Sequence, residues 1–280
     1  MYVDLHTHTT ASDGSLSARA LVELARSKGL AALAISDHDS TDSLDDALAA
    51  GRELDVEVIT AIEMSTDVAE SEIHVLGYFM DYHDAQFQSL LSVLREARLG
   101  RARKMVEKLR VLGMPLQWQR VQSFAGVGAV GRPHVAKALV EAGYVPDIKT
   151  AFDRYISRNG PAYVERYKLT PLEAVQLLLR VGGMPVLAHP LEGIGSVPMI
   201  PELAAAGLGG IECYYTGYTS QQIGLLQTIA RKYGLATSGG SDFHGEGVAA
   251  SSVLGQPPVP YGVLASLRAA WEKRHAVPQQ

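Results

Sequence analysis

Residues 1–8 of the chain read MYVDLHTH, a short apolar strand pattern that runs directly into two histidines. Residues 31–39 read AALAISDHD, in which a second apolar strand pattern runs into a histidine between two aspartates. In α/β barrels the carboxyl ends of the strands form the active-site face. Two strand patterns that both end on potential metal ligands therefore predict a barrel with its functional site on that rim.

Strand and helix patterns alternate along much of the chain, which favours an α/β architecture. The residues from Thr170 to Glu173 form a capping-box pattern with Pro171 at the first helical position, which predicts a helix start. We expect seven strands, at residues 2–5, 31–36, 56–62, 73–79, 184–187, 210–214 and 235–238. We expect helices at residues 17–28, 43–54, 171–181, 220–233 and 261–273.

Two segments depart from this alternation. Only six residues, 67–72, separate the third and fourth strands, which is too short for a parallel crossover and predicts an antiparallel fourth strand. Residues 84–167 are far longer than a normal connection and have helix patterns at 87–113, 133–143 and 148–157. We interpret residues 1–83 and 168–280 as a barrel domain and residues 84–167 as an inserted helical lid subdomain that binds substrate.

Composition excludes several classes of protein. Of the 280 residues, 47% are hydrophobic and 20% are charged, so the chain is not disordered as a whole. A net charge of −5 implies no partner by itself, and the single cysteine, Cys213, has no internal disulfide partner. No apolar run approaches the roughly 20 residues of a membrane span, and residues 1–6 do not resemble a signal peptide. We expect a cytoplasmic protein, with neither a membrane nor a protein partner implied.

Imidazole and carboxylate side chains gather at the ends of the expected strands. His6 and His8 are two residues apart and project to the same side of a strand. His74 opens its strand, which places it on the same rim if that strand is antiparallel. A lone histidine is usually a core residue, but nine such side chains on one face favour a site for two or three divalent ions, of Mn, Fe or Zn. The predicted ligands are His6, His8, Asp13, His38, Glu63, His74, His189, Asp242 and His244.

These residues resemble the motifs of the PHP (polymerase and histidinol phosphatase) superfamily. The motifs read here as His6-x-His8, Asp37-His38-Asp39, His189 and Asp242-x-His244, with Asp13, Glu63 and His74 between them. The resemblance covers residues 1–79 and about 168–250, and it implies a distorted seven-stranded (β/α) barrel with a trinuclear centre. It assigns one ion to His6, His8, Glu63 and Asp242, a second to Asp13, His38 and His244, and a third to Glu63, His74 and His189.

Basic residues of the inserted segment are candidates for substrate binding. Seven basic residues and two acidic ones lie between Arg95 and Arg110, which is usual for a solvated helix face, and we favour Arg101 as the one that meets the barrel mouth. Arg132 and His134 open a predicted helix, where free N–H groups favour anions, so we expect both to hold phosphate. His134 is also our candidate catalytic acid. Residues 126–131, GVGAVG, match the dinucleotide-binding string but lack the βαβ unit it requires, so we interpret them as a loop.

The insert, with Gly131-Arg132-Pro133-His134, resembles that of the stand-alone PHP subgroup of nucleoside 3′,5′-bisphosphate phosphatases and 5′-to-3′ exoribonucleases. This resemblance implies removal of the 3′-phosphate from nucleoside 3′,5′-bisphosphates to give nucleoside 5′-monophosphates, with a hydroxide held by metal ions, Mn above all, as the nucleophile. The alternatives are a 5′-to-3′ exoribonuclease acting on short oligonucleotides and a histidinol-phosphate phosphatase. An amidohydrolase is disfavoured because no lysine ends a strand. A non-catalytic nucleotide-binding or polymerase-accessory module is disfavoured by the complete ligand set.

Overall fold

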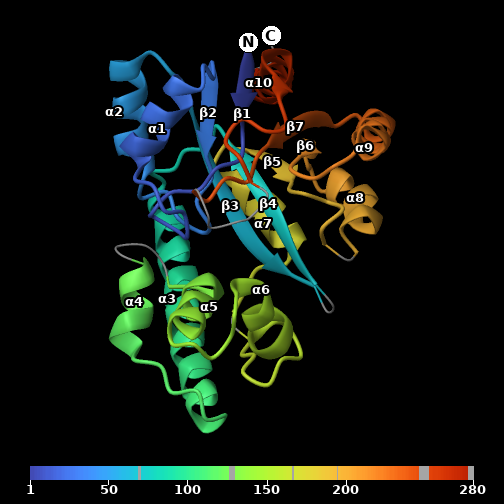
Figure 1. The fold of residues 1–280 in the computed structure, drawn as a ribbon. Coiled ribbons are helices and arrows are strands. Elements are labelled where there is room, and N and C mark those ends of the chain that lie inside the picture. The colour runs from blue at the N-terminus through green and yellow to red at the C-terminus, as the bar shows by residue number, and fades with distance from the viewer. Residues whose placement is uncertain (69–70, 126–129, 166, 194, 246–251, 277–280) are drawn as a thin grey trace.

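The structure, a computed structural model, describes residues 1–68, 71–125, 130–165, 167–193, 195–245 and 252–276. In this part of the chain the strands form one sheet in the order β7-β6-β5-β4-β3-β2-β1-β8, which curves into a barrel (Figure 1). The strands are β1 (Tyr2–Asp4), β2 (Ala32–Ile35), β3 (Glu57–Asp67), β4 (Glu72–Tyr78), β5 (Met184–Leu187), β6 (Gly210–Tyr215), β7 (Ala236–Gly240) and β8 (Val259–Pro260).

The barrel closes between β1 and β7. The Leu5 N–H donates to the Gly239 carbonyl at 3.1 Å, and beyond both strands Thr7 forms a parallel bridge with Phe243. The predicted count of seven strands is wrong by one, because β8 pairs antiparallel with β1 outside this closure. A strand of two residues is too short to produce the pattern of four to eight residues by which strands are recognised in a sequence.

The hairpin formed by β3 and β4 extends from the barrel toward the inserted segment. β4 runs antiparallel to both β3 and β5, as the short connection predicted. β3 ends at Asp67 rather than at residue 62, so Glu63 lies inside the strand, and the prediction that it closes the strand is wrong. The end of β3 meets the insert, because Arg158 pairs with Asp67 at 2.7 Å, and the Asp67 N–H donates at 3.0 Å to the carbonyl of Leu169, just after the insert.

Six helices cover the outside of the barrel (Figure 1). The capping box of α7 is present, since Thr170 and Glu173 each accept a hydrogen bond from the other's backbone N–H. α8 was not predicted, because Pro201 inside it disrupts the pattern by which helices are recognised. The helices are α1 (Ala18–Ser27), α2 (Leu44–Leu54), α7 (Pro171–Arg180), α8 (Ser196–Ala205), α9 (Ser220–Tyr233) and α10 (Tyr261–His275).

The inserted segment packs around apolar residues of its own, which include Met105, Val121 and Leu139. α4 was missed, since its buried face consists of Val121 and Ala125 alone; residues 126–129 of the glycine-rich string lie outside the described part of the chain. The division at residues 84–167 stays a prediction. Among the described residues no helix is long and apolar enough to cross a membrane. The elements are α3 (Ala85–Val111), α4 (Trp118–Ala125), α5 (Arg132–Glu141), α6 (Ile148–Ala151) and the π-helical turn η1 (Phe152–Ile156).

Candidate metal centre and adjoining pocket

The chain after β1 delivers two histidines to the barrel mouth. Thr7 fixes this segment, because its hydroxyl donates to the Ala34 carbonyl at 2.7 Å. The His8 N–H donates to the Phe243 carbonyl at 2.9 Å, which holds the segment beside the chain that follows β7. Extended backbone places alternate side chains on one side. His6 and His8 therefore point the same way, with ring centroids 5.2 Å apart.

Glu63 lies at the centre of the cluster and is 1% exposed. One carboxylate oxygen, Oε2, lies within 3.3 Å of three ring nitrogens, and the other, Oε1, lies within 3.0 Å of two more. The two oxygens of Glu63 therefore face different groups of histidines. The histidines are His6, His8 and His38 around Oε2, and His74 and His189 around Oε1.

Two further carboxylates flank Glu63. Asp13 Oδ1 lies 3.2 Å from His244 Nε2, and Asp242 Oδ1 lies 3.0 Å from His8 Nε2. The Tyr215 hydroxyl donates to the other oxygen of Asp242 at 2.9 Å, so Oδ1 is left facing the histidines. This contact between Tyr215 and Asp242 was not predicted from the sequence.

Eight of the nine predicted ligands fall into three groups whose ligand atoms lie within 4.8 Å of one another. The ninth, His189, lies 3.0 Å from Glu63. Compared with the ligand sets that the resemblance implied, His8 joins the second group and His38 stands in the third where His189 was expected. The groups are His6, His8, Glu63 and Asp242; His8, Asp13, His38 and His244; and His38, Glu63 and His74.

Six of the atoms that face into the cluster lack hydrogen-bond partners, which is rare for buried polar atoms and costs about 1–3 kcal/mol each. Imidazole nitrogens and carboxylate oxygens together are the donor set of Mn, Fe and Zn sites. The residues present therefore fit divalent cations. The unpartnered atoms are His6 Nε2, His8 Nε2, His38 Nδ1, Asp13 Oδ1, Glu63 Oε2 and Asp242 Oδ1.

The imidazoles and carboxylates of the cluster shift one another's pKa values. Burial lowers the pKa of His8, but the nearby carboxylates of Asp242 and Glu63 outweigh burial and raise it to about 10. Burial raises the pKa of Glu63, but the surrounding imidazoles hold it well below its usual range. Metal ligands must be unprotonated. A cation that enters this cluster therefore displaces protons.

A buried carboxylate beneath the cluster, Glu212, was missed by the sequence analysis. Its Oε1 accepts from His6 Nδ1 at 3.0 Å and its Oε2 accepts from the His189 N–H at 2.7 Å. In the neutral form of His6, the first contact holds the proton on Nδ1, and Nε2 is directed at Glu63 and Asp242. The available signal was a single acidic residue in the otherwise uncharged strand pattern GIECYY at residues 210–215.

Asp4 and Asp37 hold the loops that carry the ligands. Asp4 accepts from the backbone N–H groups of Ser241 and Gly255, and Asp37 accepts from the N–H and hydroxyl of Thr9. These contacts fix a strained region, since Asp39, His189 and Asp242 all have positive φ values, of 50°, 23° and 53°. The ligand-bearing loops are therefore held in place by the protein itself.

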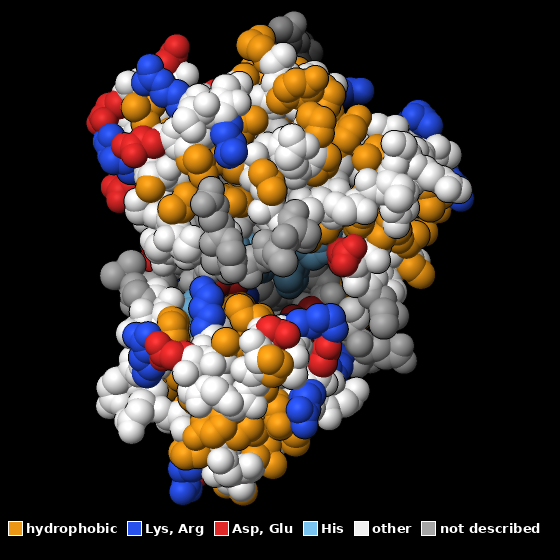
Figure 2. Space-filling model, viewed as in Figure 1, with side chains coloured by type: hydrophobic (Ala, Val, Ile, Leu, Met, Phe, Trp, Pro, Cys, Tyr) orange, Lys and Arg blue, Asp and Glu red, His pale blue; other side chains and the backbone are white. Residues whose placement is uncertain are grey.

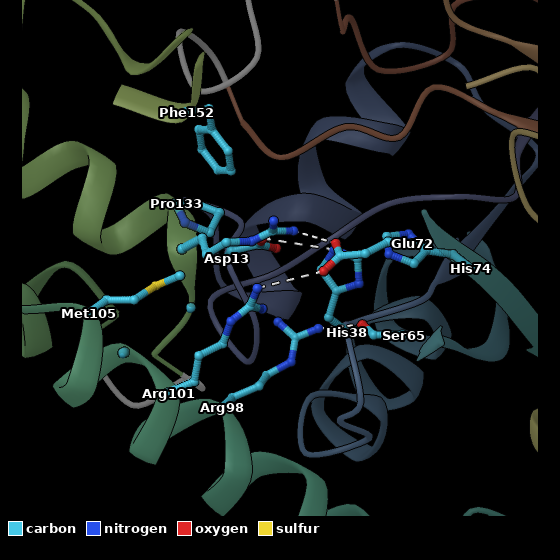
Figure 3. A pocket seen from close by; sticks show the side chains of 13 residues that line it. Asp13, His38, Ser65, Glu72, His74, Arg98, Arg101, Met105, Pro133 and Phe152 are labelled. Carbon is cyan, nitrogen blue, oxygen red and sulfur yellow. Dashed lines mark hydrogen bonds and ion pairs between the residues drawn. The ribbon is translucent and has the colours of Figure 1, made fainter. Parts of the chain in front are cut away.

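The cluster opens into a pocket whose opposite wall is the insert (Figure 3). Figure 2 shows histidines at the base of a hollow between the barrel and the inserted helices. The cavity volume is about 90 Å³, which is small beside the roughly 300 Å³ of small ligand sites. Asp13, His38 and His74 line the barrel side, and Arg98, Arg101 and Arg132 line the insert side.

Arg101 and Arg132 reach the pocket, but both meet a carboxylate that the sequence analysis missed. Arg132 forms an ion pair with Glu72, and Arg101 Nη2 lies 3.8 Å from Glu72 Oε1 without a hydrogen-bond partner. Glu72 lies two residues before His74, so strand alternation was the signal that places both on one face. Arg98 also enters the pocket and is held by Asp39 at 2.9 Å.

His134 is 1% exposed, and its Nδ1 accepts a hydrogen bond from the Gly131 N–H at 2.9 Å, which caps α5. Burial lowers its pKa to about 4. The imidazole is therefore neutral at pH 7, whereas a general acid needs the protonated form. The catalytic and phosphate-binding roles of His134 stay predictions, and the structure adds the capping role.

The fold and the site together define the class of protein. It is an α/β barrel with a cluster of histidines and carboxylates that could hold metal ions at one end. Arginines of the insert line the opposite side of the adjoining pocket. The model of the PHP domain family matches residues 4–155, more than half of the chain, and the chain belongs to this family. The resemblance predicted from the sequence is confirmed.

Two named relatives and one solved structure are similar to this chain, which is consistent with its membership of the PHP family. The chain is 34% identical over 245 residues to the 5′-3′ exoribonuclease of Haemophilus influenzae, covering 86% of this chain and 89% of that one. It is 31% identical over 250 residues to the 3′,5′-nucleoside bisphosphate phosphatase of Chromobacterium violaceum, covering 88% of each. A Bifidobacterium adolescentis structure assigned as a metal-dependent phosphoesterase has a TM-score of 0.87 at 30% identity, covering 96% of each chain. The protein is a PHP-domain metal-dependent phosphoesterase.

Proposed function

We propose that this protein removes the 3′-phosphate from nucleoside 3′,5′-bisphosphates and releases nucleoside 5′-monophosphates. The observation that carries the proposal is the pocket with two unlike walls. Asp13, His38 and His74 face it from the barrel, and Arg101 and Arg132 face it from the insert. A substrate with two phosphates matches such a pocket, because one phosphate meets the metal ligands and the other meets the guanidinium groups.

The nine predicted ligands are the residues that would hold two or three divalent ions, for which we favour manganese. When bound, these ions supply a water of lowered pKa and positive charge for the phosphate oxygens. The protein's own contribution is orientation. Glu212 fixes His6, and Tyr215 turns Asp242, so the donor atoms are arranged before any ion arrives.

We assign the helices of residues 84–167 to specificity and to exclusion of water from the pocket. Arg101 and Arg132 donate to the phosphate that does not react, with charge-assisted hydrogen bonds. Pro133 lies in the first turn of α5 and fixes the local backbone, so Arg132 starts from a defined direction. His134 supports this helix start through Gly131.

A 5′-to-3′ exoribonuclease activity on short RNA is the second candidate. The observation that favours it is the similarity to the Haemophilus influenzae protein of that name, which is of the same order as the similarity to the bisphosphate phosphatase. The hollow between the barrel and the inserted helices (Figure 2) is where such a nucleotide chain would lie. A histidinol-phosphate phosphatase fits less well, because its substrate has one phosphate and a cationic amine that the basic wall repels.

The test is phosphate release by the manganese-loaded protein from adenosine 3′,5′-bisphosphate, histidinol phosphate and an aryl phosphate, with the nucleotide product identified by chromatography. We expect adenosine 5′-monophosphate and a kcat/KM at least tenfold above that for the aryl ester. Adenosine 3′-monophosphate as the product, or a preference for histidinol phosphate, would contradict the proposal. Stepwise release of 5′-nucleotides from a short RNA, faster than the bisphosphate reaction, would favour the second candidate.

A further inference from the structure

Glu72 is an acidic residue inside a basic subsite. It opens β4, and its carboxylate pairs with Arg132 of α5 and with Lys168, while Arg101 of α3 approaches to 3.8 Å. Figure 3 shows the Glu72 side chain facing the same pocket as Arg98 and Arg101. An acidic group here is unexpected, because it holds the same N–H donors that a substrate phosphate needs.

The charges of this subsite do not cancel. Arg101 and Lys168 are almost completely buried, with side-chain exposures of 7% and 3%. Three cations against the carboxylate of Glu72 leave a net charge of +2. That sum counts these four side chains alone; around them, Asp67 lies 3.6 Å from Lys168 and also pairs with Arg158, and Asp39 pairs with Arg98.

One donor of the subsite is also unsatisfied. Arg101 Nη2 is buried and has no hydrogen-bond partner, although the same guanidinium donates through Nε to the Val164 carbonyl at 2.8 Å. Buried charged donors are costly to leave unpaired. The Glu72 carboxylate leaves this donor of Arg101 unsatisfied, whereas a phosphate monoester offers three terminal oxygens and a charge of −2.

We propose that Glu72 is a resident anion that a substrate phosphate must displace, and that it sets the charge this phosphate needs. A phosphate monoester dianion carries twice the charge of the carboxylate, and it therefore takes over the donors of Arg101, Arg132 and Lys168. A phosphodiester monoanion has the same charge as Glu72 and gains little by the exchange. The subsite thus selects a terminal phosphate monoester and rejects a diester-linked phosphate, a selectivity that rests on the proposed function.

Glu72→Gln tests this idea with two ligands, adenosine 5′-monophosphate and its 5′-methyl phosphodiester, whose affinities for the manganese-loaded full chain are measured by titration calorimetry. We expect the wild type to bind the monoester and to show no measurable binding of the methyl diester. Glu72→Gln should tighten the monoester at least fivefold and bring the diester into the measurable range, because no anion has to be displaced. Glu107→Gln, the same change on the outer face of α3, is the matched control and should alter neither affinity.

Thermal melting provides a second readout that a purely structural role would not produce. Without ligand, Glu72→Gln should melt lower than the wild type, because three cations are left together, but the monoester should raise its Tm by more than it raises the wild-type Tm. Adding Arg132→Gln should remove most of the gain in affinity, as in a double-mutant cycle. If Glu72→Gln does not fold, Glu72→Asp should show a smaller tightening in the same direction.

Weaker or unchanged binding of both ligands to Glu72→Gln would overturn the proposal, because Glu72 would then organise the cations rather than compete with phosphate. Equal binding of the two ligands by the wild type would overturn it as well. These outcomes are separable from failure of the proposed function, since neither ligand carries a 3′-phosphate and no hydrolysis is measured. A protein that released no 3′-phosphate from any bisphosphate would still give a definite result here.

Discussion

The barrel mouth and the inner face of the insert place charged side chains in one pocket, but they hold them in different ways. At the mouth, six atoms of the predicted ligands have no hydrogen-bond partner, while the carboxylates beneath them, such as Glu212, use both oxygens. On the insert, Arg98 and Arg132 are already paired, with Asp39 and Glu72. The side chains at the barrel mouth therefore leave atoms open for cations that must be supplied. The arginines of the insert must instead give up a carboxylate partner when they bind a substrate.

This difference separates chemistry from selectivity. Removing an atom from the mouth removes a ligand that nothing else replaces. Removing a charged side chain from the insert changes the net charge of a group of side chains whose charges partly cancel. We therefore expect large losses that do not depend on the substrate at the mouth, and smaller, substrate-dependent changes on the insert.

The largest effect should come from Asp13→Asn and His38→Ala, each of which removes a predicted ligand. With manganese supplied, kcat should fall on the order of 10³-fold or more on every phosphate ester, since several kcal/mol of metal assistance are lost. Circular dichroism and Tm should show that the fold survives. If both variants kept the wild-type kcat, the distinction between the barrel mouth and the insert would be wrong, because the mouth would then not contain the reacting centre.

Glu212→Gln should have the next largest effect, although Glu212 belongs to no ligand group. An amide replaces one of the two oxygens by an NH₂ donor, so it cannot offer a separate acceptor oxygen to His6 Nδ1 and to the His189 N–H. We expect manganese affinity to fall by about 10- to 100-fold, which calorimetry or metal analysis after dialysis would measure. The ¹⁵N shifts of His6 should also report a loss of the single tautomer. Unchanged affinity and shifts would remove Glu212 from the support of the mouth.

Arg101→Ala should weaken turnover of a nucleoside bisphosphate by about 10- to 100-fold in kcat/KM, since a charge-assisted hydrogen bond contributes about 1.5–3 kcal/mol. Hydrolysis of a small aryl phosphate should suffer much less. Lys104→Ala, at an exposed position on the same helix, is the control. Equal losses on both substrates would mean that Arg101 acts on the mouth rather than on the second phosphate.

The smallest effect should come from His134→Ala. Because His134 is neutral at pH 7 and caps α5, we expect a modest loss of similar size for a ribose-phosphate ester and for an ester with an acidic phenol leaving group. A loss confined to the ribose ester would instead establish His134 as the acid that protonates the leaving oxygen.

His134 also makes a testable contribution to pH dependence. Its folded pKa of about 4 lies below the value of about 6.5 expected for the unfolded chain. The unfolded state therefore binds more protons between these values, and the folded state loses stability as pH falls from about 6.5 toward 4. His134→Gln should make the free energy of unfolding less steep over this range, in denaturant titrations at several pH values. An unchanged slope would show that His134 is not buried in its neutral form.

The sequence predicted which histidines and carboxylates gather at the barrel mouth, because these residues follow local patterns. His6, His8, His38 and His244 stand beside strand segments, and the antiparallel direction of β4 followed from the length of one connection. The sequence did not predict contacts between residues that are far apart in the chain. Glu212 is 206 residues from His6, and Glu72 is 60 residues from Arg132. No spacing rule connects such pairs until the fold brings them together, and β8 and α8 were missed because a two-residue strand and an internal proline hide their patterns.

The β3–β4 hairpin has a consequence for transplanting specificity between members of this family. The insert leaves the barrel after β4 and returns at α7, so it can be exchanged as one continuous segment between two points close to the sheet. The hairpin residues Asp67 and Glu72, however, form ion pairs with that segment, Asp67 with Arg158 and Glu72 with Arg132. A chimaera that replaces only the helices would leave two barrel carboxylates facing foreign partners. The functional unit of exchange is therefore the insert together with the hairpin tip.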